Sequence, residues 1–494
     1  MRTLRHPWVL LLLLVAAPAV LVAQPPMVTK YLHEFESANG GGHPNDAIND
    51  HQAFLYAAAF FQARGGYGTL VLEDGEYIVG VQHLRNVNDT MPGPGWDAWR
   101  YPTGDPQGPD CKALVASQNG FVLDSCFNFT IQGGSNTRIR YRDCLYYGTF
   151  LHDEITGEVF SAVGVQDAIV LDTLLQDTIE VSSCLTCLDS LILPQWLDIP
   201  LRHAAVGTMF TFRNCDSVAV RDLELDGNID GAILGGKAAF DGIQTAYDGV
   251  IIWESSRCLI ENVHSHHFGR DGLMFAGSYD DTATPFADAY PGLHVDIDPA
   301  DSTTIPGNRT VLFNNHILNS QFNWNGRQGF SWTALAGLTM AGCDLNYNGC
   351  GRLSSSPGSG LDIEGIGGPL RVRHGVFTDC RFLHNYSAGI LSDQAQCIGQ
   401  QGFTFIDCTV KAGEAGLALL VEARDMEFHG CAIYGYVDEL FEQAENLPRD
   451  PDFDLLFRKT DFFEEDDDWA YLKADPLNCG GGPHKLDLVG GGRA

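Results

Sequence analysis

A glycine recurs at a nearly constant interval in the second half of the chain, and this repeat restricts the fold more than any other feature. It occurs in the segments RDGLMFA, RQGFSWT, SGLDIEG, AGILSDQ and AGLALLV, at Gly272, Gly329, Gly360, Gly389 and Gly416. The last three intervals are 31, 29 and 27 residues. Short β-rich segments that return in this way, with no helical segment between them, predict a solenoid of stacked coils.

A second column of residues repeats in phase with the glycines. Cys343, Cys380, Cys408 and Cys431 occupy the same place in AGCDL, TDCRF, IDCTV and HGCAI. Two columns in phase favour a parallel β-helix, in which each strand pairs with the strand of the next coil. We expect these cysteines to be buried thiols, because small apolar side chains pack well inside a coil. Disulfides stay possible, since coils about 4.8 Å apart lie within the range that such a bridge tolerates.

The N-terminal part predicts a helix followed by a strand-turn-strand unit. Residues 50–66 have an apolar face, with Asp50 as a candidate N-cap and Gly65-Gly66 as the stop. The segment GTLVLEDGEYIVG then places an Asp-Gly turn between two extended stretches. We therefore assign residues 24–116 to an N-terminal cap and first strands, 117–435 to the β-helix, and 436–494 to an acidic tail that covers the last coil.

Residues 1–23 predict a secretory signal peptide. Arg2 and Arg5 precede the apolar run WVLLLLLVAAPAV, and small residues follow at possible cleavage sites. No later segment is apolar enough for long enough to cross a bilayer. We expect a secreted or periplasmic protein, monomeric and without a membrane span.

Several segments resemble the pectate-lyase superfamily of right-handed parallel β-helix proteins. They are GGYGTLVLEDGEYIV, FTIQGGSNTRIRY and LELDG, and the resemblance extends over about residues 45–435. It implies an all-β fold, a single-stranded right-handed parallel β-helix solenoid with an N-terminal capping helix. It also implies a carbohydrate-active protein with a polysaccharide partner, because the superfamily includes polysaccharide lyases, glycoside hydrolases and uronate epimerases. The polygalacturonase-type pattern of Asn-Thr-Asp, Asp-Asp and Gly-His-Gly is absent from the sequence.

The charge of the chain restricts its partners. Sixty-three acidic residues face 30 basic ones, for a formal net charge of −33. This balance argues against a nucleic acid or an anionic membrane as partner. It also disfavours a polyanionic substrate, unless arginines line the site locally.

Strand alternation divides the glycine-aligned segments into inward and outward rows. The inward residues are predicted to be Leu273, Phe330, Leu361, Ile390 and Leu417, followed by Phe275, Trp332, Ile363, Ser392 and Leu419. One outward row is predicted to hold Met274, Ser331, Asp362, Leu391 and Ala418, and the next Ala276, Thr333, Glu364, Asp393 and Leu420.

Three carboxylates in these outward rows form the predicted catalytic set. Asp362 and Glu364 would lie about 6.6 Å apart along one strand, with Asp393 on the following coil. Like charges at this separation raise at least one pKa, so that an acid and a carboxylate can coexist as glycoside hydrolysis requires. The alternatives are an acidic Ca²⁺ site and a solvated surface.

Turn residues near these carboxylates are candidates for substrate binding. Arg270-Asp271 and Arg327-Gln328 precede aligned glycines, where they could bind sugar groups or brace the turns. His264 and His266 would share a face, with His267 in the turn and Tyr247 in a nearby loop wall. No third ligand for a metal is evident beside the histidines, so we predict no metal site and no required cofactor, with Ca²⁺ as a possibility.

The sequence thus predicts an exported glycoside hydrolase that acts on a polysaccharide through Asp362, Glu364 and Asp393. A uronate polysaccharide lyase or epimerase is the first alternative, although lysines, which could neutralise a uronate, are scarce in the repeat region. A noncatalytic glycan-binding or surface β-helix protein is the second.

Overall fold

The computed structural model describes most of the repeat region and the N-terminal unit. The described residues are 24–36, 38, 40–86, 113–151, 201–234, 239–240, 243–244, 246–277, 296–297, 311–351, 353–355, 357–365, 372–392, 401–411, 413, 417–421, 424–439, 454–463, 472–473 and 485–489. The predicted signal peptide and Asp393 lie outside them. No helix in the described part of the chain is long and apolar enough to span a bilayer.

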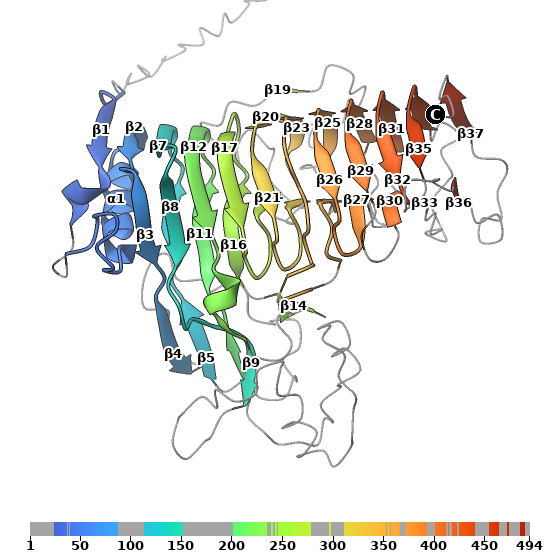
Figure 1. Cartoon of the computed structure of the whole chain (residues 1–494). Coiled ribbons are helices and arrows are strands. Elements are labelled where there is room, and N and C mark those ends of the chain that lie inside the picture. The colour runs from blue at the N-terminus through green and yellow to red at the C-terminus, as the bar shows by residue number, and fades with distance from the viewer. Residues whose placement is uncertain are drawn as a thin grey trace, which may run out of the picture.

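The strands form the stacked faces of a parallel β-helix, which runs from the blue N-terminal end to the red C-terminal end in Figure 1. The first face has the order β1 (Val28–Tyr31), β2 (Gly66–Val71), β7 (Phe127–Gln132), β12 (Asp216–Asp226), β17 (Leu259–His266), β20 (Val311–Leu318), β23 (Ala336–Ala341), β25 (Arg373–Thr378), β28 (Gln401–Ile406), β31 (Arg424–His429), β34 (Asp454–Arg458) and β37 (Lys485–Val489).

The second face contains the glycine-aligned segments. Its order is β6 (Phe121–Asp124), β11 (Gly207–Arg213), β16 (Tyr247–Trp253), β18 (Leu273–Ala276), β22 (Phe330–Trp332), β24 (Leu361–Ile363), β27 (Ala388–Ser392), β30 (Leu417–Val421), β33 (Tyr436–Glu439) and β36 (Leu472–Lys473). Both faces continue beyond residue 436, where β34, β36 and β37 pair with preceding strands of the stack.

A third, shorter face links the other two. It includes β3 (Gly75–Val79), β8 (Thr137–Tyr141), β21 (Gln321–Asn323), β26 (Arg381–Leu383), β29 (Thr409–Lys411), β32 (Ala432–Tyr434) and β35 (Asp461–Phe463). The long strands β12 and β17 belong to both the first and the third face, because β12 pairs with β7 and then β8, and β17 with β20 and then β21. Their C-terminal ends therefore lie side by side at one corner of the coil.

Strand register confirms most of the predicted rows. Leu273, Phe330, Leu361 and Ile390 are paired in succession, and so are Met274, Ser331, Asp362 and Leu391. The prediction is wrong for β30, where Ile390 pairs with Leu419 and Leu391 with Leu420. Leu417 instead lies opposite Ala388, and Gly416 lies outside the described residues. A shift of two residues leaves the inward and outward faces unchanged.

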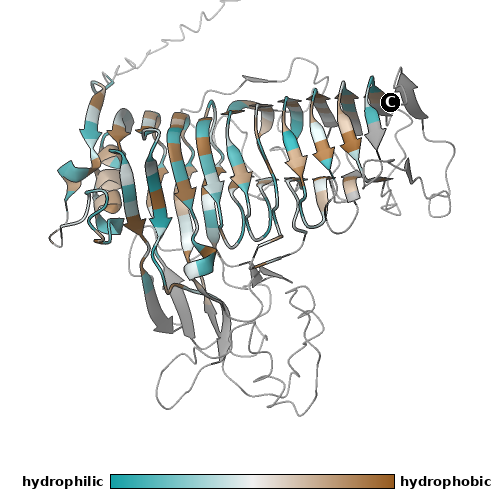
Figure 2. Ribbon diagram, in the orientation of Figure 1, coloured by the Kyte–Doolittle hydropathy of each residue, from teal (hydrophilic) through white to brown (hydrophobic). Residues whose placement is uncertain are grey.

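Apolar and polar residues alternate along the strands (Figure 2), and the apolar ones fill the interior. Phe377, Phe405, Phe428 and Phe457 stack in a row, with ring centroids 4.5 to 5.0 Å apart. The predicted cysteine column is also confirmed as free and buried thiols. A hydrogen bond with the Cys343 thiol and burial raise the pKa of Cys380 to about 12, which disfavours the reactive thiolate form of Cys380 at neutral pH.

Helix α1 (His51–Ala63) and the short helix η1 (Leu32–Phe35) lie at the N-terminal end of the stack (Figure 1). The apolar face of α1 packs on the core, where Phe54 contacts Phe210 and Phe61 contacts Phe129. Asp50 occupies the N-cap position of the helix, as predicted, but its side chain makes no capping hydrogen bond there. Its carboxylate accepts hydrogen bonds from the backbone N–H of Gly42 and Ile78 at 2.7 and 2.8 Å, which joins the preceding loop to strand β3.

A small mixed sheet extends away from the stack (Figure 1). It consists of β4 (Gln82–Asn86), β5 (Ala113–Ser117), β9 (Tyr146–Leu151), β10 (Leu201–Ala204) and β13 (Ile233–Leu234). Three further short strands are β14 (Ala239–Phe240), β15 (Ile243–Gln244) and β19 (Asp296–Ile297), and the helical turn η4 spans Ile229–Gly231.

Candidate functional site

The turn that joins β17 to β18 separates two groups of polar residues. His264, His266 and His267 lie at its start, and Arg270 and Asp271 lie at its end. The sequence predicts that Arg270 and Asp271 border the carboxylate face, that His264 and His266 also bind substrate, and that His267 lies in the turn. The structure instead gives each group its own set of partners.

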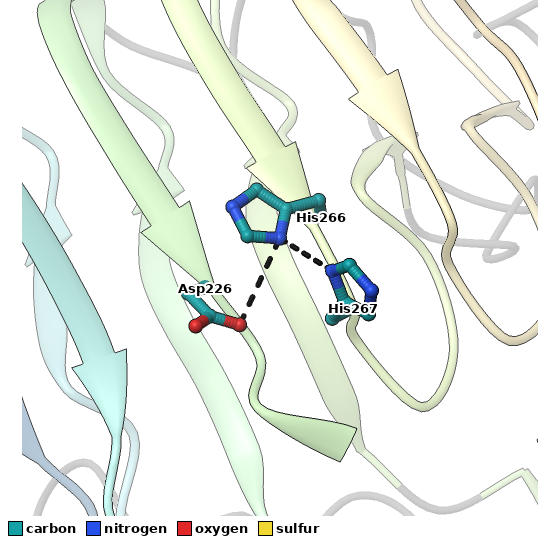
Figure 3. Close-up of side chains that lie close together, drawn as sticks. All are labelled: Asp226, His266 and His267. Atoms are coloured by element: carbon teal, nitrogen blue, oxygen red, sulfur yellow. Dashed lines mark hydrogen bonds and ion pairs between the residues drawn. The ribbon is translucent and has the colours of Figure 1, made fainter. Parts of the chain in front are cut away.

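The first group, which we name the histidine cluster, consists of Arg138, Glu224, Asp226, His264, His266 and His267. Parallel pairing of β12 with β17 places Glu224 beside His264 and Asp226 beside His266. Val263 is buried, so His264 and His266 share the outer side as predicted, with ring centroids 4.2 Å apart. Figure 3 shows how Asp226, His266 and His267 point toward one another.

His266 is the centre of this cluster. Its Nε2 lies 3.0 Å from Glu224 Oε1, and its Nδ1 lies 2.6 Å from His267 Nδ1 and 3.7 Å from Asp226 Oδ1. One ligand atom from each of Asp226, His266 and His267 lies within 4.8 Å of the others. The third donor beside the two histidines, which is not evident in the sequence, thus comes from the preceding coil.

Arg138 of β8 holds the two carboxylates of the cluster in place. Its Nε lies 3.0 Å from Glu224 Oε1, its Nη2 contacts Asp226 Oδ2, and its Nη1 lies 3.4 Å from Glu76 Oε2. The backbone N–H of Asn228 also donates to Asp226 Oδ1 at 2.7 Å. Both carboxylates are therefore held by a side chain of β8, and Asp226 is also held by the backbone that follows its own strand.

Burial favours the neutral form of His264 and His267, the two histidines that flank His266 in the cluster. It lowers the pKa of His264 to about 4, and the neighbouring His266 acts in the same direction. Burial and then His266 also lower the pKa of His267. The hydrogen bond from His266 lowers the pKa of Glu224. At neutral pH, His264 and His267 are neutral imidazoles beside an ionised carboxylate.

A row of stacked rings, which we name the aromatic strip, begins at the histidine cluster. It contains His267, Trp324, Tyr347 and His384, with successive centroids 6.4, 4.5 and 5.2 Å apart and planes within 16° of parallel. Trp324 and Tyr347 are 38% and 37% exposed. The strip therefore crosses four coils at the surface.

Backbone conformation explains why these rings align. All four residues occupy left-handed turn positions, with φ between 55° and 58°. The next residue in the last three coils is Asn325, Asn348 or Asn385, each fully buried. Their side-chain amides bond to the preceding coil: Asn348 Oδ1 accepts from the backbone N–H of Asn325 at 3.0 Å, and Asn385 Oδ1 accepts from that of Asn348 at 2.9 Å. The pairs Trp-Asn, Tyr-Asn and His-Asn are the sequence signal that could have revealed the strip.

The second group forms a buried network of ion pairs instead of an exposed rim. Arg270 binds Asp248 through two contacts of 2.5 and 2.7 Å, and Arg327 binds Asp271 through two contacts of 2.9 and 2.6 Å. All four side chains are buried. The position that we predicted for Arg270 and Arg327, at the border of an open face, is therefore wrong, while a contact with substrate stays a prediction.

The predicted catalytic carboxylates adjoin this buried network. Asp362 is 2% exposed and accepts a hydrogen bond from Gln328, whose Oε1 accepts one from the Ser359 hydroxyl at 2.6 Å. Glu364 is half-buried. Burial lowers the pKa of Arg327, but the negative charges around it have the larger total effect and raise this pKa above its ordinary value. The largest contribution comes from Asp271, followed by Glu364 and Asp362. Asp362 therefore points outward from the coil, as predicted, without reaching solvent.

Tyr247 is part of the core and does not line a loop wall. It begins β16, is 1% exposed, and its hydroxyl donates to the backbone carbonyl of Gly227 at 2.5 Å. Its ring contacts Tyr147 and Phe268. Tyr247 thus holds the corner next to the histidine cluster.

Comparison with known proteins agrees with the fold. Residues 248–433 match the family model described as right handed beta helix region. No curated protein matches the chain in sequence. Among solved structures, ORF18 of Geobacillus virus E2 is similar at 11% identity and a TM-score of 0.46, over 91% of this chain and 58% of that one.

Two further structures show the same level of likeness. The Agl-KA catalytic domain has 12% identity and a TM-score of 0.41, over 91% of this chain and 60% of that one. The mannuronan C-5 epimerase AlgE4 A-module of Azotobacter vinelandii has 12% identity and a TM-score of 0.31, over 90% and 96%. The chain spans 58% and 60% of the first two structures, and likeness at these identities concerns the fold alone.

Proposed function

We propose that this protein binds a polysaccharide along the aromatic strip and hydrolyses it at the histidine cluster. One observation supports this best: His267 belongs to both groups. Its ring stacks with that of Trp324, and its Nδ1 contacts His266. A glycan that lies along the strip would therefore reach the cluster directly.

The strip offers ring edges to a ligand, because stacking covers the ring faces. Those edges combine apolar C–H groups with the polar atoms of indole, phenol and imidazole. Sugars present a similar mixture of C–H and hydroxyl groups. Since the rings belong to successive coils, about 4.8 Å apart, they form a regular row of contacts for a regular polymer.

Charge favours a neutral glycan over a polyuronate. The chain has a formal net charge of −33, and Arg138 already contacts Glu76, Glu224 and Asp226. A uronate carboxylate would compete with these three groups for one guanidinium. Hydrolysis of a neutral glycan requires no such contact, so we prefer it to elimination or epimerisation. An exported protein, as residues 1–23 predict, would meet such substrates.

Glu224 is the carboxylate that a glycan in the strip could approach. Its side chain is 37% exposed, against 6% for Asp226. We assign it the activation of the attacking water. Asp362, Glu364 and Asp393 stay as the second candidate set, since half-buried Glu364 is near enough to Arg327 to raise the pKa of its guanidinium.

The test is a panel of neutral and uronate polysaccharides incubated with the full chain. New reducing ends without unsaturated uronates would support hydrolysis. Absorbance of unsaturated uronates would replace it by elimination. Binding in affinity electrophoresis without any product would reduce the proposal to glycan binding, and neither binding nor product on the whole panel would refute it.

A further inference from the structure

We infer that Asp226, His266 and His267 form a binding site for a divalent cation of the zinc type. The site would take one carboxylate oxygen and two imidazole nitrogens, which lie within 4.8 Å of one another (Figure 3). Mixed N and O donors suit Zn²⁺ and Co²⁺, whereas Ca²⁺ and Mg²⁺ require oxygen ligands. This inference does not depend on the proposed polysaccharide hydrolysis.

The contact with Glu224 sets the tautomer of His266. Because an ionised carboxylate only accepts, the N–H of His266 is at Nε2, which lies 3.0 Å from Glu224 Oε1. Nδ1 then presents a lone pair toward His267 Nδ1 at 2.6 Å and Asp226 Oδ1 at 3.7 Å. A carboxylate behind the far nitrogen of a histidine is the arrangement that orients metal-ligating imidazoles.

Converging acceptor atoms need a hydrogen-bond donor or a cation between them. Without a cation, His267 Nδ1 has to carry a proton and donate it to the lone pair of His266 Nδ1. A divalent cation can instead accept both lone pairs and the Asp226 oxygen. The cluster is therefore electrostatically suited to a cation.

Asp226 is held ready for this role by the structure around it. It is 4% exposed, and the backbone N–H of Asn228 and the guanidinium of Arg138 fix its two oxygens. Asn228 itself adopts a left-handed conformation, with φ of 53°, which turns the chain back toward the carboxylate. The aspartate thus loses little conformational freedom when it binds an ion.

Ion binding requires one small movement. Two nitrogens at about 2.0 Å from a tetrahedral zinc are about 3.3 Å apart, which exceeds the 2.6 Å between the two Nδ1 atoms. His266 is held by Glu224, whereas His267 lies in the turn and is half-buried. We therefore expect His267 to shift, and the fourth ligand position to stay available for water or a substrate oxygen.

The experiment measures binding of Zn²⁺ and Co²⁺ to the metal-stripped full chain by titration calorimetry and by elemental analysis after dialysis. We expect the wild type to bind one equivalent of Zn²⁺ more than variants of the three ligand residues do. With Co²⁺ it should show the visible absorption bands typical of a four-coordinate site. Asp226→Asn, His266→Gln and His267→Asn should each remove this equivalent. Glu224→Gln should keep the site but weaken it by about 10-fold or more.

A matched control comes from another histidine-carboxylate pair of the solenoid. His429 Nε2 lies 2.7 Å from Glu427 Oε2, and among the described residues no third His, Cys, Asp or Glu completes a ligand group with this pair. His429→Gln should therefore leave metal binding unchanged. Equal Zn²⁺ binding by the wild type and by folded Asp226→Asn and His267→Asn variants would overturn the inference, and so would an equal loss in His429→Gln. Metal binding without activity on any glycan would leave this inference intact and contradict only the proposed hydrolysis.

Discussion

Arg270 and Asp248 form a two-contact ion pair, at 2.5 and 2.7 Å, with side chains that are 1% and 0% exposed. Asp248 also accepts from the Thr208 hydroxyl at 3.2 Å. Such a pair stabilises a fold mainly because either charge, left without the other, is expensive to bury. A loss of stability on substitution therefore distinguishes an arginine with a structural role from one that binds substrate.

We expect Arg270→Met to lower the free energy of unfolding by about 3–5 kcal/mol, because Asp248 loses its charged partner in the interior. Denaturant unfolding measures the change. The double variant Arg270→Met/Asp248→Asn should recover part of the loss. If the single variant is as stable as the wild type and only KM rises, Arg270 contacts substrate and the buried pair is unimportant for stability.

The cysteine column should resist thiol reagents in the folded protein. The hydrogen bond with Cys380 and burial raise the pKa of Cys408 to about 12. Since Cys144 is the exposed one among the described thiols, it should be labelled first, and Cys144→Ser should remove that fast step. Peptide mapping by mass spectrometry measures each site. Labelling of Cys380 or Cys408 at the rate of Cys144 would contradict the stacked interior.

The aromatic strip should affect glycan affinity more than stability. We expect Trp324→Asn and Tyr347→Asn to weaken polysaccharide binding about 10-fold or more, while the melting temperature stays the same or rises. Asparagine tolerates the left-handed backbone better than an aromatic residue does. Affinity electrophoresis measures the binding, and Tyr56→Ala on helix α1, 48% exposed, is the matched control. Loss of affinity in the control as well would show a nonspecific effect.

Asp50 should make stability depend on pH in the acidic range. Burial raises its pKa from 3.8 to about 6 in the folded protein. Between these two values the folded state binds more protons than the unfolded state, so stability falls as pH rises from about 4 to about 6. The contribution amounts to about 3 kcal/mol. Denaturant unfolding of wild type and Asp50→Asn across this range measures it, and a constant difference between the two would exclude the effect.

The two carboxylate sets can be distinguished by activity. If hydrolysis takes place at the histidine cluster, Glu224→Gln should lower kcat by about 100-fold or more, while Glu364→Gln should leave it unchanged. Asp362→Asn should reduce stability by about 1–2 kcal/mol, because its buried hydrogen bond with Gln328 is altered. Initial rates of reducing-end formation measure kcat. Loss of activity in Glu364→Gln alone would move the site to the second face.

The sequence predicts the fold well because its signals are local and repeated. Period-two alternation and the columns that contain Gly360 and Cys380 set the strands, their inward faces and most of the register. The candidate site was predicted less well. The carboxylate partners of His266 are Glu224 and Asp226, and Arg138 in turn contacts both carboxylates. These residues lie one or two coils earlier in the chain, and no spacing links them to the segment that contains His266. Alternation also indicates which residues point outward from the coil, but not which of them other parts of the chain cover, as the buried Asp362 demonstrates.

The left-handed turn position shared by His267, Trp324, Tyr347 and His384 makes ligand preference modular. Each coil contributes one side chain to the strip through a backbone geometry that its buried asparagine neighbour, where present, fixes independently of the ring. Evolution, or a protein engineer, could exchange a single ring without disturbing the adjacent coils. Duplication of one coil would lengthen the strip by about 4.8 Å, so that selectivity for longer glycan chains can be gained in discrete steps.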